Sequence, residues 1–396
     1  MLAAVILVLT AFASCAGLLV LQIGLWRVFT SAPFLKPCPS DHQIPQTSLT
    51  VVIPAFNEAE NIAACVKSVL ASTPPCAEWS VLVVDDESSD ATLELARSAA
   101  AAGASRCRVV QAGPRPSGER WVGKNWACHR AMDTVHSDWV LFIDADVRLQ
   151  PDALRRALKQ AVDEQADLFS LAPRLECGCL SEWMVQPIMA SLLGLGFPLN
   201  ATNDPSTDVA FAAGPFMLFS TQAYRAIGGH RDLADAVVED LALARKIKSG
   251  GYRLRYRLGL DAVMLRMYSN LSALWEGWTK NWFLGLDRNV LRALGASAVV
   301  VQMFSLPWFL LPAALLLLLL MPERGAFWWA LLGFSALGVV QQVLLRLWTR
   351  QRFALPMRHW WLMGAGGLLI GLIGPVSVWR TLTGRGWTWK GRSLAA

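Results

Sequence analysis

The sequence predicts an α/β fold with a doubly wound, mostly parallel sheet and transmembrane helices at both ends of the chain. Between residues 49 and 260, short β-branched runs alternate with helical patterns, which is typical of parallel strands joined by crossover helices. On either side lie long apolar stretches of membrane-spanning length. The 396 residues are 54% hydrophobic and 17% charged, and the mean hydropathy of +0.38 is too high for an ordinary soluble enzyme.

The N-terminal segment, residues 1–29, is predicted to be a transmembrane anchor. Its first 26 residues carry no charged side chain and are long enough to span a bilayer. A cleaved signal peptide is the alternative, but the segment lacks a basic start and is followed by Arg27 and Lys36. These cations favour an uncleaved anchor whose C-terminal flank faces the cytoplasm. A Pro-rich linker, residues 30–48, leads to the middle region.

The middle region begins with alternating strands and helices. Strands are expected near residues 49–53, 80–85, 108–111 and 139–143. Helices are expected at residues 59–72 and 91–102. Farther on, the Ala-Gly-Pro run at residues 213–215 indicates a tight turn into another strand, and residues 241–249 have a helical pattern closed by two glycines.

Polar and acidic residues follow three of the expected strands. They are Pro54, Asn57 and Glu58, then Asp85 and Asp86, then Asp144 and Asp146. Ligands of open α/β sheets bind at the carboxyl ends of the strands, so neighbouring strands would bring all three groups to one crevice. There the first two groups can bind a nucleoside. Two carboxylates one residue apart repel each other unless a cation neutralises them, so the last pair predicts a divalent metal, Mg²⁺ or Mn²⁺, beside a diphosphate.

Three more residues are candidates for function. Lys124 ends a loop rich in Gly, Pro and Arg, where it can contact a phosphate or base; a solvated surface lysine is the alternative. Glu239 and Asp240 begin the last helical pattern, where acids are common for dipole reasons alone. As a base, Asp240 would take a proton from an acceptor hydroxyl. We expect the helix terminus to lower its pKa, so that the leaving diphosphate must drive the proton transfer.

Three late apolar blocks predict a C-terminal transmembrane region, residues 298–380, followed by a basic cytoplasmic tail, residues 381–396. Basic residues follow both the second and the third block, and the positive-inside rule places both groups in the cytoplasm. A third complete crossing would separate them, so the last block either spans the membrane or is re-entrant or interfacial. The net charge of +6 is concentrated near these segments and indicates an anionic lipid surface rather than nucleic acid.

As a set, the motifs resemble those of family 2 nucleotide-sugar glycosyltransferases, which have a GT-A fold. The matching stretches lie at residues 52–58, 84–92, 144–146 and 239–240, within a domain expected at residues 49–265. The resemblance implies inverting transfer from a nucleotide-diphospho-sugar, with a UDP-sugar favoured. It implies nucleoside binding by Asp85 and Asp86, metal and diphosphate binding by Asp144 and Asp146, and a catalytic role for Asp240 with Glu239. Glu87 departs from the pattern, because the family usually has Gly there.

Within that family the layout is most similar to hopanoid-associated and carotenoid glycosyltransferases. It shares with them an N-terminal anchor, late membrane helices, the Gly-Lys-x-x-Ala loop at residues 123–127 and the Trp-Lys-Gly-Arg ending at residues 389–392. Processive polysaccharide synthases of the family usually carry Gln-x-x-Arg-Trp after the base. Here the corresponding stretch, residues 278–282, reads Trp-Thr-Lys-Asn-Trp, which disfavours a growing polymer.

The sequence thus predicts a multi-pass enzyme of the cell membrane that glycosylates a lipid hydroxyl, of carotenoid or hopanoid type, at the cytoplasmic face. Stretches 181–199 and 271–286 resemble in-plane amphipathic helices; core helices are the alternative. The second stretch lies within residues 266–297, which are predicted to be an interfacial amphipathic segment. A polyprenyl phosphate acceptor is a second possibility, with Lys280 and Arg288 as candidate contacts. A membrane scaffold with a degenerate domain is a third, but it predicts eroded carboxylates and every motif acid is present.

Overall fold

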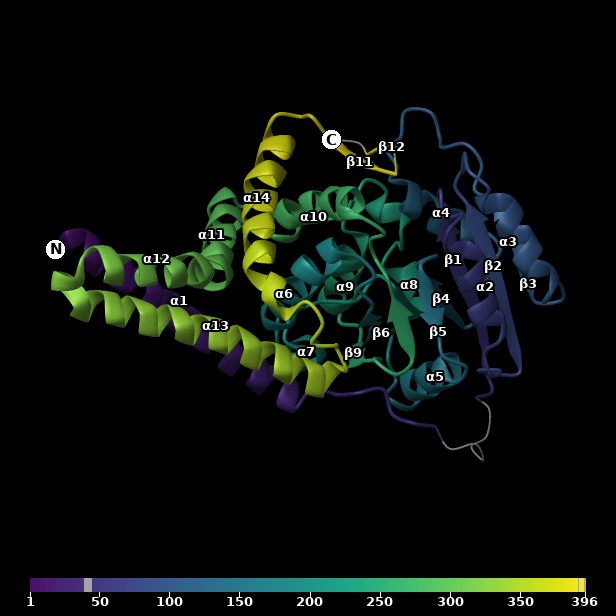
Figure 1. The fold of residues 1–396 in the computed structure, drawn as a ribbon. Helices are drawn as coiled ribbons and strands as arrows, with labels where there is room; N and C mark the ends of the chain where they lie inside the picture. The colour runs from purple at the N-terminus through teal and green to yellow at the C-terminus, as the bar shows by residue number, and fades with distance from the viewer. Residues whose placement is uncertain (39–44, 391, 395–396) are drawn as a thin grey trace.

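The molecule consists of a sheet domain and a bundle of long helices that projects from it (Figure 1). The computed structural model describes residues 1–38, 45–390 and 392–394. Part of the predicted linker, residues 39–44, and part of the predicted tail, residues 391 and 395–396, lie outside the described residues.

The central sheet has seven strands in the order β3-β2-β1-β4-β8-β6-β9. Its parallel half consists of β1 (Ser48–Ala55), β2 (Glu78–Asp85), β3 (Cys107–Gln111) and β4 (Trp139–Ile143). In the other half, β8 (Phe216–Ser220) runs antiparallel to β4 and to β6 (Leu168–Ala172), and β6 pairs in parallel with β9 (Leu254–Leu258). The predicted doubly wound, mostly parallel sheet is confirmed, with one antiparallel strand in it.

Helices cover both faces of this sheet. One apolar layer includes α2 (Ile62–Leu70), α3 (Thr92–Ala101) and α5 (Ala153–Asp163). The layer on the other face includes α4 (Gly123–Ala131), α8 (Thr221–Ala226) and α9 (Glu239–Ser249). β1 is buried on both sides, as its continuous run of β-branched residues predicts. A small second sheet contains β5 (Val147–Leu149), β10 (Val263–Leu265) and β7 (Arg174–Leu175).

The strand order determines where the acidic residues meet. β1 lies between β2 and β4, and the registers place Ala55 beside Asp85 and Val52 beside Phe142. The three strands that end in polar residues are therefore direct neighbours and run in the same direction. Their carboxyl ends form one edge of the sheet, where ligands of such folds bind.

Four helical segments in the described part of the chain are long and apolar enough to cross a membrane. The first is α1 (Leu2–Thr30), and the second, Val290–Leu320, comprises α11 (Val290–Val300), a π-helical turn (Val301–Ser305) and α12 (Leu306–Leu320). The others contain α13 (Gly325–Phe353) and α14 (Met363–Leu382). Figure 1 shows α1, α12 and α13 side by side as a bundle, whereas α14 and α11 run across the end of that bundle. The π-helical turn marks the change of direction within the second segment.

The bundle and the sheet domain meet in a shared apolar core, which we call the junction core. It combines residues of α1, α14, α6 (Leu180–Gly196) and α10 (Leu271–Gly285) with Tyr256 of β9 and with Tyr268. The stretches that resemble in-plane amphipathic helices correspond to α6 and α10. Each contributes buried residues to the junction core and leaves leucines exposed, among them Leu193, Leu195 and Leu271. The described chain also contains the short helix α7 (Leu199–Asn203) and the C-terminal hairpin of β11 (Trp387–Trp389) and β12 (Arg392–Leu394).

Candidate active site

Two acidic groups from distant parts of the chain are joined by one lysine. The Nζ atom of Lys124, at the start of α4, lies 2.6 Å from Oδ1 of Asp144 and 2.7 Å from Oε1 of Glu239. Burial alone would lower the pKa of Lys124, but these two carboxylates hold it well above its usual value. Lys124 is therefore a fixed cation between the end of β4 and the start of α9, and the alternative of a solvated surface lysine is wrong.

Asp146 lies beside this group and has no such partner. Its Oδ1 atom is buried and accepts no hydrogen bond from the residues that the structure describes. Burial, and then the charges of Asp144 and Glu58, raise the pKa of Asp146 well above its usual range. An orphaned carboxylate oxygen whose ionisation is disfavoured in this way is stabilised when a cation binds next to it.

Asp144 and Asp146 fit a divalent cation that is shared with a substrate. Across the described ranges, no group of three or more His, Cys, Asp or Glu residues is arranged to hold a metal ion alone. Mg²⁺ in nucleotide sites typically takes one or two carboxylates and completes its coordination with phosphate oxygens and water. The donor set at this edge of the sheet matches that pattern. The cation and the phosphate would therefore bind together rather than one after the other.

The loops that follow β1 and β2 are joined by hydrogen bonds. The backbone N–H of Ser89 donates to Oδ1 of Asn57 at 2.9 Å, and the N–H of Asn57 donates to Oγ of Ser88 at 3.0 Å. Asp85 is buried, and its Oδ2 accepts from the N–H of Ser88 at 3.2 Å, which closes the second loop. Pro54 lies inside β1 beside Val84 and shapes the strand end without offering a polar side chain.

Asp86 lies between two arginines. Nη2 of Arg115 is 2.7 Å from Oδ2 of Asp86, and Nη1 of Arg392 contacts the same oxygen. Burial raises the pKa of Asp86 to about 6, against the opposing effect of both guanidinium groups. Sequence reasoning missed both arginines as site residues, although Arg115 lies in the loop that precedes Lys124 and Arg392 in the basic tail. Their pairing with Asp86 has no local signal.

Two glycines allow carboxylates to approach the backbone closely. A Cβ atom at Gly123 would collide with Oδ2 of Asp86, and a Cβ atom at Gly214 would lie 2.9 Å from Oδ2 of Asp240. The Gly214 N–H donates to that same Asp240 oxygen at 3.2 Å. The glycine of the Gly-Lys loop and the glycine before β8 are therefore part of the geometry of the site.

Asp240 has the properties of a general base. Burial, and then the adjacent charge of Glu239, raise the pKa of Asp240 to about 6. The expectation of a lowered pKa for Asp240 is therefore wrong. The N–H of Leu241 does donate to Oδ1 at 2.7 Å and lowers it, but burial outweighs that bond. For Glu239, burial alone would raise the pKa, but Lys124 lowers it below its usual value, so Glu239 stays ionised as the partner of the lysine.

Glu87 occupies a backbone conformation that favours glycine. Its φ angle is 57°, in the left-handed region, so the turn after Asp86 has a backbone conformation suited to the Gly that the resemblance expects, although this chain has Glu there. The nearest cations to its exposed carboxylate are Arg115 at 3.8 Å and Arg392 at 4.0 Å, and such exposed pairs contribute little.

We therefore expect Glu87→Gly to stabilise the protein. The left-handed conformation costs a non-glycine residue roughly 1–2 kcal/mol, which exceeds the entropy lost by adding a glycine. The apparent unfolding temperature, measured by differential scanning fluorimetry in detergent, should rise. Glu87→Ala is the matched control, because it removes the same charge and keeps the strained Cβ. If the two variants have equal stability, backbone strain at this turn is not the cause.

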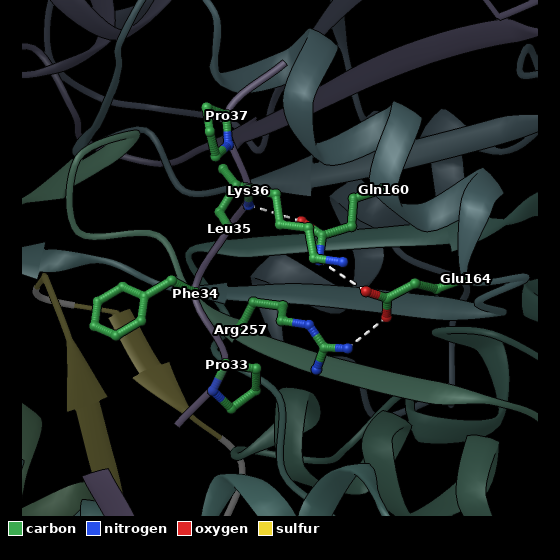
Figure 2. Close-up of a pocket in the computed structure, with 8 residues that line it drawn as sticks. All are labelled: Pro33, Phe34, Leu35, Lys36, Pro37, Gln160, Glu164 and Arg257. Carbon is green, nitrogen blue, oxygen red and sulfur yellow. Dashed lines mark hydrogen bonds and ion pairs between the residues drawn. The ribbon is translucent and has the colours of Figure 1, made fainter. Parts of the chain in front are cut away.

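A pocket at the far edge of the sheet is separate from this site. Figure 2 shows its lining by residues 33–37, Gln160, Glu164 and Arg257. The backbone N–H of Lys36 donates to Oε1 of Gln160 at 2.9 Å, and Glu164 pairs with Arg257. The first contact joins the chain after α1 to α5, and the second joins the C-terminal end of α5 to the edge strand β9. None of the acids at the ends of β1, β2 and β4 lines this pocket.

Comparisons with known proteins agree with this geometry. Residues 50–228 match the model of Glycosyl transferase family 2. The 4,4'-diaponeurosporenoate glycosyltransferase of Staphylococcus aureus (strain USA300) is 29% identical over 241 residues, which cover 60% of this chain and 61% of that protein. The chain thus spans about three fifths of the length of the curated relatives it matches.

A solved structure shares the fold across nearly the whole chain. The mannosyltransferase PcManGT from Pyrobaculum calidifontis, in complex with GDP-Man and Mn²⁺, superposes with a TM-score of 0.51 at 19% identity. The match covers 93% of this chain and 99% of that one. Residues 50–228 therefore match a glycosyl transferase family 2 domain, and the sheet domain that contains them has a GT-A fold.

Proposed function

We propose that the protein is a membrane-bound inverting glycosyltransferase that moves a sugar from a nucleotide-diphospho-sugar to the hydroxyl of a membrane lipid. One observation carries the lipid acceptor: the acids of the site border the junction core. Burial and the nearby charge of Asp240 raise the pKa of Tyr256, and burial and the charge of Asp146 raise that of Tyr268. Both tyrosines belong to the core that joins the sheet domain to the membrane helices. A lipid hydroxyl at the bilayer surface would thus be close to the base.

The comparisons support the chemical classes of donor and acceptor. The relative from Staphylococcus aureus is named for a carotenoid acid, which supports a carotenoid-type acceptor or one of similar shape, such as a hopanoid. The solved mannosyltransferase holds GDP-Man and Mn²⁺, which supports a nucleotide-diphospho-sugar and a divalent cation. We favour a UDP-sugar as donor.

The residues of the site have distinct parts in the proposed reaction. Asp144 and Asp146 would hold the divalent cation, which when bound neutralises the diphosphate and makes it a better leaving group. Asp86 would accept an N–H of the nucleoside, and Lys124 keeps Asp144 and Glu239 in place. Asp240 would take the proton of the acceptor hydroxyl. At the same time the hydroxyl oxygen of the acceptor would bond to the anomeric carbon, and the bond from that carbon to the diphosphate would break. Attack from the opposite face inverts the configuration.

The direct test uses purified enzyme, labelled UDP- and GDP-sugars, Mn²⁺ and lipid extracted from the host membrane. A labelled glycolipid is expected, and lipid profiling of a strain that lacks the protein should show the same species missing. If no donor yields product or nucleotide release, the proposal is wrong. Calorimetric measurement of nucleotide-sugar binding in the presence of metal separates two causes of a negative result. An enzyme that lacks only its acceptor should still bind the nucleotide-sugar, whereas an inactive scaffold should not.

A polyprenyl phosphate is the second candidate acceptor, because Lys280 of α10 lies near the base. Its charge acts on Glu239 and Asp240, and burial lowers its own pKa. An anionic acceptor would need such a cation, whereas a neutral hydroxyl would not. If Lys280→Glu leaves sugar transfer to the extracted membrane lipid unchanged, this candidate is wrong.

For the membrane topology, we propose three crossings with the sheet domain in the cytoplasm and α14 in the interface. α14 runs across the bundle instead of along it (Figure 1), and half of its most apolar window is buried, 50% against 33% for α1. It is held against the junction by polar contacts. The N–H of Phe283 donates to Oγ of Ser377 at 3.0 Å, and Oγ of Ser305 donates to the carbonyl of Gly364 at 2.8 Å. An interfacial α14 keeps both basic stretches on one side, as the positive-inside rule requires.

Cysteine labelling in whole cells tests this topology. In a background where Cys38, Cys177 and Cys179 are Ser, a membrane-impermeant maleimide should label Arg324→Cys, between α12 and α13, in intact cells. Arg385→Cys, after α14, should react only after permeabilisation, because three crossings leave it in the cytoplasm. Labelling of Arg385→Cys in intact cells would show that α14 crosses the membrane.

A further inference from the structure

The C-terminal hairpin, β11 and β12, lies against the candidate active site although it is more than 300 residues from β1 and β2 in the chain. Figure 1 shows it near α10 and α4, beyond the end of α14. Trp389 packs near Val122 and Val237, and the Nζ of Lys280 lies 4.5 Å from the centre of a Trp389 ring. Trp389 thus anchors the hairpin by apolar and cation–π contacts.

Two basic residues of the hairpin engage acids of the candidate site. The Nζ atom of Lys390 lies 2.6 Å from Oε1 of Glu58 and donates to the carbonyl of Asn57 at 2.9 Å. Nη1 of Arg392 pairs with the Asp86 carboxylate, and Nη2 donates to the Asp86 carbonyl at 2.9 Å. The Arg392 guanidinium carbon lies only 3.8 Å from the centre of the Phe56 ring.

This arrangement of Arg392 has the chemistry of a bound nucleobase. A guanidinium group is flat, stacks on aromatic faces and presents N–H donors at its edge, as uracil and guanine do. Its partners are an aromatic face, Phe56, and a carboxylate, Asp86, which together form a site for a base that stacks and donates N–H. An arginine and a base cannot occupy that face at the same time.

We infer that the C-terminal hairpin occupies the nucleobase subsite in the donor-free protein and that the donor must displace it. This inference rests on the proposed function, because it takes Asp86 and Phe56 as the place of the donor's base. Asp86 keeps its bond to Arg115 when Arg392 leaves, so the buried carboxylate stays paired during the exchange. Lys390 and Glu58 are both partly exposed, so the second contact is also easily broken.

The hairpin lowers the apparent affinity for the donor. When the binding-competent state is only a fraction of the population, the measured dissociation constant is larger than the intrinsic one by the inverse of that fraction. The two hydrogen bonds of the Arg392 guanidinium, one to the buried Asp86 carboxylate and one to the Asp86 carbonyl, are strong enough to keep the open state near a tenth of the molecules or below. Removing the guanidinium should therefore tighten nucleotide binding about tenfold.

The test titrates UDP and GDP, with Mn²⁺, into the full-length protein in detergent by calorimetry. Arg392→Gln should bind one of the two nucleotides about tenfold more tightly than the wild type does. Arg385→Gln is the matched control: it removes the same charge from the same tail, but its guanidinium lies 4.4 Å from the centre of a Trp379 ring and away from the acids. Its affinity should not change. Unchanged binding by Arg392→Gln overturns the inference, and weaker binding would make Arg392 a ligand of the donor instead.

Hydrogen–deuterium exchange of residues 387–394 tests the docking without any nucleotide. The hairpin should be protected in the wild type and should lose protection in Asp86→Asn and when the binding nucleotide is added. Free exchange in the wild type overturns the inference. If neither nucleotide binds to any variant while the hairpin stays protected, the proposed function has failed and the hairpin contact is structural. If the wild type and Arg392→Gln bind nucleotide equally, the proposed function stands and the inference is wrong.

Discussion

Asp146→Asn is expected to reduce sugar transfer on the order of a thousandfold and to abolish metal-dependent nucleotide binding. The divalent cation contributes several kilocalories per mole to stabilising charge on a leaving diphosphate, and each 1.4 kcal/mol corresponds to about tenfold in rate. Asp146 has a buried oxygen that lacks a partner among the described residues, whereas Asp144 is already paired with Lys124. The amide of Asn keeps the size of the side chain and removes the charge that the cation needs.

The same substitution should raise the unfolding temperature in metal-free buffer. The folded-state pKa of Asp146 is raised, so its stabilising effect is present at low pH and is lost as pH rises above the unfolded-state value. At neutral pH the folded wild type therefore carries a free-energy cost, from burying a charge or from taking up a proton, that Asn lacks. Mn²⁺ should stabilise the wild type and leave the variant unchanged. Asp163→Asn, which alters an exposed acid paired with Lys159, is the control. A variant that is less stable without metal, or that still responds to Mn²⁺, contradicts this account.

The part of the site that sequence reasoning found is the part encoded by local patterns. β1, β2 and β4 are continuous apolar runs that stop at polar residues, so their ends are visible in the sequence, and the α/β alternation favours parallel neighbours. The prediction that their polar residues meet in one crevice required the three strands to be neighbours, and the strand order places β1 between β2 and β4. The direction of β8 has no such signal, because a five-residue strand reads the same in either orientation.

Contacts between distant segments were out of reach of sequence reasoning. The bridge from Lys124 to Asp144 and Glu239 joins α4, β4 and α9, and the pairing of Arg392 with Asp86 spans 306 positions. The pKa of Asp240 was predicted in the wrong direction for the same reason. The helix terminus is a local property, but burial depends on everything packed around the carboxylate. The departure at Glu87 was visible in the sequence, whereas only the backbone shows that this Glu adopts a left-handed conformation.

Asp240→Asn is expected to keep nucleotide affinity while losing sugar transfer by roughly 10²- to 10⁴-fold, the usual contribution of a general base. The residue acts only in the chemical step, so turnover falls and the binding of donor and metal does not. The packing should survive, because the Asn side-chain oxygen can still accept from the N–H of Leu241 or Gly214. Glu239→Gln is an informative partner: it releases Lys124, so it should disturb the binding of donor and metal as well. Normal transfer by Asp240→Asn would show that another group is the base.

The pH dependence of the wild type provides an independent test of the same assignment. A base with a pKa of about 6 is mostly ionised at pH 7 and is protonated as the pH falls below 6, so kcat/KM for the acceptor should drop about tenfold per pH unit on the acid side. The donor and Mn²⁺ are held at saturation, since Asp86 also has a pKa near 6 and would otherwise add its own effect on donor binding. In Asp240→Asn the residual rate should be flat across this range. A base whose pKa had been lowered by the helix terminus would instead leave the wild-type rate constant down to pH values well below 5.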